Sequence, residues 1–111
     1  MIEKTVLDYL NDKLPVPVYM EVPEDVETSY VIIEKTGGGM TNQIWTATLA
    51  IKSVAASLFN AAALNIAVIE AMLAIADTTE ISKCSLNSNY NFTDTRTKEY
   101  RYQAVFDIVY F

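Results

Sequence analysis

The sequence contains no histidine and a single cysteine, Cys84. Without histidine, the chain lacks the commonest general base, the commonest metal ligand and every Ser–His or Cys–His nucleophile pair. A lone cysteine excludes a disulfide within the chain and fits either a reducing compartment or a fold that is indifferent to redox state. Because Cys84 shares an expected strand face with Leu86, we interpret it as a small core residue. We therefore expect a protein that is not an enzyme, with no catalytic residue, cofactor or metal site.

Glycine, proline and basic residues are also scarce. Three glycines and three prolines in 111 residues leave no room for a flexible linker, and the length predicts one domain spanning 1–111. Eight basic against fourteen acidic residues give a net charge of −6. A protein that grips nucleic acid needs lysines and arginines to neutralise phosphates, so specific DNA binding is not expected.

The hydrophobic pattern predicts an α+β domain with elements in the order α-β-β-β-α-β-β. Helical periodicity indicates helices over 2–13 and 57–77, the second capped by Ser57. Prolines confine 18–22 to an edge strand or extended segment. Alternating residues predict strands over 30–36, from 44 onward, and over 80–92 and 99–111. This order is typical of a mostly antiparallel sheet of four to five strands with two helices on one face.

Two loops are candidate contact regions. The segment "TGGGMT" resembles a phosphate loop only superficially, because it lacks the following Lys-Ser/Thr and joins two strands. Its glycines are expected to stop the strand and leave a loop too long for a tight turn. This loop is a mobile loop, a contact arm or a bare hairpin tip. The polar turn "TDTRTK" is either an exposed turn or a salt-sensitive subunit contact. The candidate residues in these loops are Gly37, Gly38, Gly39, Met40, Asp94, Arg96 and Lys98.

The second helix has more apolar surface than one sheet can cover. Its large apolar side chains occupy an arc of about 220°, whereas a helix lying on a sheet needs about 100°. The first helix, a neighbouring subunit or a lipid surface could cover the excess. Glu70 inside the stretch costs roughly 2.5–3.5 kcal/mol near a bilayer centre, so we expect a buried helix and no membrane span.

The last strand carries apolar residues on both faces. One face combines tyrosines with Phe106 and Ile108, while the other has Val105 and Val109, and then Phe111, where water is expected. Trp45 shares a strand face with Leu49 and is expected in the core. A small domain with apolar residues on both sheet faces is expected to bury them against copies of itself. The candidate subunit interface comprises Phe59, Ile66, Leu73, Val105, Val109 and Phe111.

An ordered set of segments resembles a known family. After an N-terminal helix come "PVYMEVPE", "YVIIEKTGGG", "IWTATLAIKSVAASLFNAAALNIAVIEAML" and the closing "NYNFTDTRTKEYRYQAVFDIVYF". Together they resemble the small tail-terminator and tail-completion proteins of long-tailed bacteriophages, often labelled minor capsid proteins in prophages. The match spans nearly the whole chain, and all of its motifs are structural.

The resemblance implies a ring, usually a hexamer, that caps the tail tube and presents a surface to the head-completion protein. DNA would pass through this ring without specific binding, and the acidic balance suits such a channel. The protein would reside in the virion at the tail–head junction, and in the host cytoplasm during assembly. Two alternatives are a head-completion or connector component, and a monomeric module that binds a small ligand or peptide in a pocket lined by Tyr100, Tyr102 and Phe106.

Overall fold

A computed structural model describes residues 1–77 and 80–111. The chain folds as the α+β domain expected, with the expected order of elements. These elements are α1 (Ile2–Lys13), β1 (Val18–Tyr19), β2 (Tyr30–Thr41), β3 (Ile44–Ala55), α2 (Leu58–Leu73), the 3₁₀ turn η1 (Ile75–Asp77), β4 (Ile81–Asn91) and β5 (Tyr100–Tyr110).

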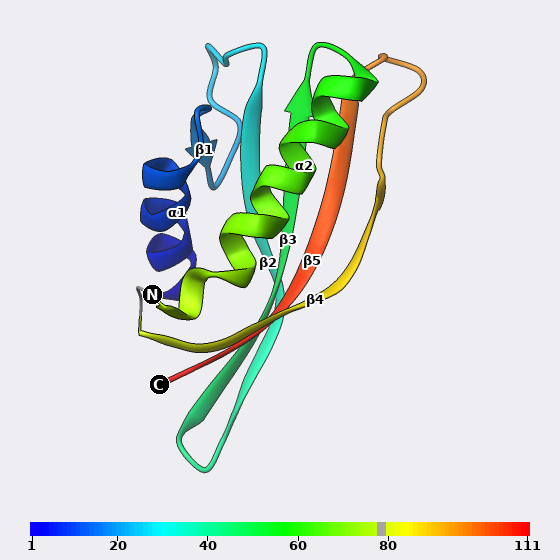
Figure 1. The fold of residues 1–111 in the computed structure, drawn as a ribbon. Coiled ribbons are helices and arrows are strands. Elements are labelled where there is room, and N and C mark those ends of the chain that lie inside the picture. The colour runs from blue at the N-terminus through cyan, green and yellow to red at the C-terminus, as the bar shows by residue number, and fades with distance from the viewer. Residues whose placement is uncertain (78–79) are drawn as a thin grey trace.

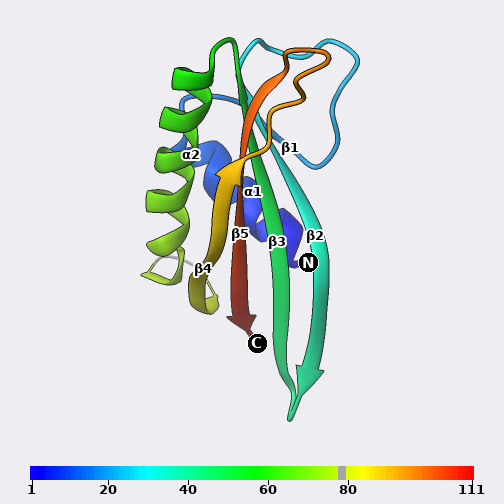
Figure 2. The same cartoon turned by 90° about the vertical axis from the view of Figure 1, so that its right-hand side faces the viewer.

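The strands form a five-stranded sheet in the order β1-β2-β3-β5-β4. The short β1 runs parallel to β2 at one edge, and all other pairs are antiparallel. Both helices lie on one face of the twisted sheet, with α2 running along its length (Figures 1 and 2). The largely antiparallel sheet and the two helices agree with the fold predicted from the sequence.

The core lies between α2 and the two central strands. Ser57 caps α2 as predicted, because its hydroxyl accepts a hydrogen bond of 3.1 Å from the Asn60 amide. The inner side of α2 is fully buried at Val68 and Met72, which belong to the same apolar cluster as Phe106 of β5. The other elements pack around this layer, which α2 forms with the sheet.

The first helix lies beside α2 and does not cover its outer side. Ile2, Val6 and Leu10 of α1 are buried in the core. The Tyr9 hydroxyl donates a hydrogen bond of 2.7 Å to the Ala71 carbonyl oxygen, which fixes α1 against the alanine-rich flank of α2. The small side chains of that flank leave room for the Tyr9 ring, and the outer side of α2 is not used by α1.

The hairpin of β2 and β3 extends far beyond the helices, and here the sequence prediction was wrong. The glycines do not stop the strand: Gly37, Gly38 and Gly39 pair with Thr48, Ala47 and Thr46, and no glycine has a positive φ.

The expected long loop is a tight turn. Asn42 and Gln43 have φ values of 52° and 66°, and they form a two-residue turn closed by the pair Thr41 and Ile44. Two consecutive positive φ values suit a type I′ turn, whose twist matches that of the flanking strands. We call residues 37–46 the arm; all of them are exposed (Figures 1 and 2).

A mismatch in length explains why the arm is bare. The 12 residues of β2 or β3 span about 40 Å, whereas the 16 residues of α2 span about 24 Å. One helix therefore cannot cover the whole face of these strands. The uncovered part is the arm.

Adjacent residues of α2 test this packing. Met72 is fully buried, whereas Leu73 is 52% exposed. We expect Met72→Ala to lower the free energy of unfolding by about 2–5 kcal/mol, because it leaves a cavity, and Leu73→Ala to change it by about 0.5 kcal/mol or less. Urea unfolding at protein concentrations low enough to keep the chain monomeric measures both. Equal losses would mean that the outer side of α2 is buried within one chain.

Candidate interaction surfaces

The described residues hold no group of three or more His, Cys, Asp or Glu side chains that could bind a metal ion. Cys84 is partly buried against the main core. Burial, and then the nearby Asp107 carboxylate, raise the pKa of its thiol to about 11. The thiol is therefore protonated at neutral pH and lacks the thiolate that a nucleophile needs. Surfaces rather than a reactive centre are the candidate sites.

The first surface runs along the outer side of α2. Phe59, Ile66 and Leu73 are 81%, 57% and 52% exposed, although each is a large apolar residue. With the half-buried Ala62 and Ile69, they recur at alternating steps of three and four residues. This spacing places them on one side of the helix and is typical of a helix that packs lengthwise on a partner. We call these five residues the outer stripe.

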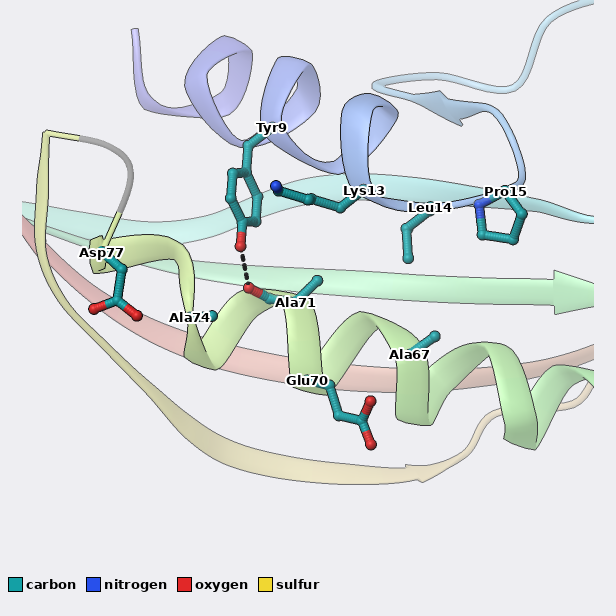
Figure 3. A pocket seen from close by; sticks show the side chains of 9 residues that line it. All are labelled: Tyr9, Lys13, Leu14, Pro15, Ala67, Glu70, Ala71, Ala74 and Asp77. Atoms are coloured by element: carbon teal, nitrogen blue, oxygen red, sulfur yellow. Dashed lines mark hydrogen bonds between the residues drawn. The ribbon is translucent and has the colours of Figure 1, made fainter.

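Among the described residues, nothing covers Phe59, Ile66 and Leu73 of the outer stripe, whereas Ile69 packs partly against the core. The first helix was one expected cover, and that possibility is contradicted because α1 lies on the alanine flank instead. A hollow of about 490 Å³ separates the two helices there, and Figure 3 shows Lys13 on one rim with Glu70 and Asp77 on the other. Burial, and then the Asp77 carboxylate, raise the pKa of the Tyr9 phenol, which therefore stays a hydrogen-bond donor to α2.

The second surface is the face of the sheet without helices. Val105 and Val109 lie on it, half-buried, as the alternation of β5 predicted, and Phe111 follows β5 with 74% of its surface exposed. Between the two valines, the Asp107 carboxylate accepts hydrogen bonds from the Thr48 hydroxyl and the Asn87 amide, at 3.1 and 3.0 Å. The six candidate interface residues thus lie on two different faces of the molecule.

The third surface is the arm. Its exposed apolar side chains are Met40, Ile44 and Trp45, with 48%, 38% and 42% of their surfaces accessible. The prediction that Trp45 lies in the core was wrong: it faces the helix side of the sheet but lies beyond the end of the helix, stacked on Tyr110 with ring centres 6.3 Å apart. Beside it is a hollow of about 390 Å³, lined by Lys35, Thr36, Gly37, Gly38, Gly39 and Trp45.

The turn between β4 and β5 lies at the opposite end of the sheet from the arm (Figure 1). The Asp94 carboxylate accepts hydrogen bonds from the backbone amides of Arg96 and Thr97, and these bonds lower its pKa. Their contribution to the turn is present above the ordinary carboxyl pKa and is lost as the pH falls through the lowered one. Lys98 completes the turn with a φ of 56°.

A cation–aromatic cluster beside this turn was missed in the sequence. The Phe92 ring lies close to both Lys52 and Arg101, whose Nζ and Cζ atoms are 5.5 and 4.7 Å from the ring centre. Arg101 also pairs with Glu99 at 2.7 Å. Lys52 lies far from the other two in the chain, and the pairing of β5 with both β3 and β4 brings the three residues together.

Two further observations concern the alternatives. By length and composition, Leu58–Asp77 is apolar enough to cross a membrane, but its inner side lies on the sheet, where buried Asn65 donates to the Asn89 side chain at 3.3 Å. Phe106, expected to line a ligand pocket in a monomeric module, is fully buried in the core. It has no surface to offer a ligand.

No protein-family model matches the chain, and no curated protein matches it. The resemblance to tail-terminator proteins therefore remains an expectation based on the sequence segments quoted above.

The raised thiol pKa gives a prediction for Cys84. At pH 8, a pKa of about 11 in place of 9.0 reduces the thiolate fraction about 100-fold. We expect iodoacetamide to alkylate the folded protein about 100-fold more slowly than the urea-unfolded chain, with the rate rising towards pH 11. Mass spectrometry of timed samples measures both rates. Equal rates at pH 8 would show a reactive thiol.

Proposed function

We propose that this protein is a structural subunit that assembles with copies of itself into a ring, and that the ring terminates a phage tail tube. The observation that carries the proposal is the outer stripe, in which three large apolar side chains are each more than half exposed. The second part of the proposal, that the ring terminates a phage tail tube, is supported by the resemblance in the order of sequence segments.

The energetics favour a partner for this stripe. Burying one large apolar side chain contributes about 1.5–3 kcal/mol, so burying Phe59, Ile66 and Leu73 together is worth several kcal/mol. That is a large part of the net stability of a small domain. Exposed apolar patches of this kind mark interaction sites. Binding to copies of the same chain buries the stripe on every subunit.

The ends of the molecule suit a connector between two different structures. The arm projects from one end, and the polar turn with Asp94, Arg96 and Lys98 lies at the other (Figure 1). A ring of such subunits exposes the polar turns on one rim, while the arms can reach towards neighbouring subunits. One rim would contact the tube protein and the other the head-completion protein, with DNA passing through an acidic ring that does not bind its phosphates.

Oligomer mass and tube capping test the proposal. We expect the purified chain, alone or with tube protein, to form closed rings of one mass by mass photometry and negative-stain microscopy. We also expect these rings to halt growth of the tube. A chain that stays strictly monomeric at high concentration, even with tube protein present, would contradict the proposal.

Two variants of α2 test whether the outer stripe forms the subunit contact. Ile66→Asp places a charge on the outer stripe, and we expect it to yield a folded monomer because a buried unpaired charge opposes association. Asn60→Asp changes another exposed residue of α2 that lies off the stripe, and it should assemble like the wild type. Circular dichroism confirms that both variants are folded. Normal rings from Ile66→Asp would exclude the stripe from the assembly.

A further inference from the structure

We infer that the subunits join head to tail, with the arm of one copy packed on the outer stripe of the next. This inference rests on the proposed function, since it names the two surfaces that hold the ring together. The partner that each surface receives is therefore a second copy of this chain.

The arm is a part of the sheet whose apolar face α2 does not cover. Across the hairpin, Met40 pairs with Trp45 and Gly38 pairs with Ala47, on the same face as Leu49 further along β3. That face is covered by α2 at Leu49, which is fully buried, and is bare at Met40 and Trp45. The arm thus continues the helix-binding face of the sheet past the point where α2 ends. It has the character of a surface on which a helix packs.

The outer stripe is a helix surface without its sheet. The inner side of α2, with Val68 and Met72, is already buried on the sheet of its own chain. Phe59, Ile66 and Leu73 form a second apolar side, whereas a helix that serves one sheet needs only one. The chain therefore carries an uncovered sheet face and an unused helix side. Because the arm projects away from α2, these two surfaces meet only between copies (Figure 1).

Shape and charge also match. The hollow between Gly37–Gly39 and Trp45, about 390 Å³, can receive a side chain such as that of Ile66, which is exposed on the stripe and lies one helical turn before Glu70. Lys35 lines the same hollow and has no ion pair among the described residues. The only charged residue in the α2 sequence is Glu70, which is exposed. Packing the arm on the stripe would bring Lys35 and Glu70 of two copies towards each other.

The area is sufficient for a stable contact. The stripe and the bare face of the arm each present roughly a few hundred Å² of apolar surface, by the usual areas of such side chains. This apolar surface would form the centre of an interface, and a polar rim around it would supply the rest of the standard area of about 800 Å² per partner. Because each copy uses different surfaces towards its two neighbours, the contact is heterologous, and such contacts form a ring when the rotation between neighbours closes.

Mixing two defective variants tests this pairing. One variant carries Met40→Ser and Trp45→Ser in the arm, and the other carries Ile66→Asp in the stripe. We expect each variant alone to be monomeric and an equimolar mixture to form heterodimers and nothing larger, because the mixture retains one intact arm and one intact stripe. Mass photometry measures the species, under the conditions in which the wild type forms rings. A mixture that stays monomeric, or an arm variant that assembles alone, would overturn the inference.

Charge exchange gives a second test that does not disturb the core. We expect Lys35→Glu and Glu70→Lys each to weaken subunit association roughly three- to tenfold, because each places like charges together. The double variant, which exchanges the two charges, should recover wild-type association. Additive losses in the double variant would separate these residues and contradict the pairing.

The outcomes also separate the inference from the proposed function. If the two variants form heterodimers when mixed but wild-type rings do not halt tube growth, the pairing of arm and stripe is supported and the terminator role is refuted. If wild-type rings halt tube growth but the mixed variants stay monomeric, the terminator role is supported and the pairing of arm and stripe is refuted.

Discussion

The packing of α2 on the sheet is the constraint on which the rest of the molecule depends. One helix of 16 residues lies over β3 and β5, and Val68 and Met72 close the core with Phe106 beneath them. Where the helix ends, the strands continue without cover. The position of α1 follows from the same packing, because the alanine flank of α2 is where Tyr9 reaches a backbone carbonyl.

Much of the fold could be predicted because local patterns set it. The spacing of apolar residues located α1, the Ser57 hydroxyl marked the start of α2, and alternation assigned the faces of β5. The arm could not be predicted in the same way. Glycine is a weak strand former, yet cross-strand pairing with β3 holds Gly37–Gly39 extended, and Asn42-Gln43 turns the chain without the glycine that usually marks a type I′ turn.

The candidate surfaces were predictable in part. An apolar arc twice as wide as one sheet requires indicated that α2 needs a second cover, and Phe59 and Ile66 are exposed in the single chain. Alternation also gave Trp45 its correct face, but a face is buried only where another element covers it, and that depends on the lengths of helix and strand in three dimensions. For the same reason, sequence alone could not separate Val105 and Val109 from the stripe on the far side of the sheet.

The three consecutive glycines also have a mechanical consequence. Residues without side chains, in a two-stranded ribbon with no helix behind it, make the arm more compliant than the packed body of the domain. In the ring proposed above, bending strain between neighbours would concentrate in these ribbons and leave the hydrophobic layers undistorted. Each joint could then adjust its angle slightly, so that one rigid subunit can fit a circumference imposed by the structures above and below it.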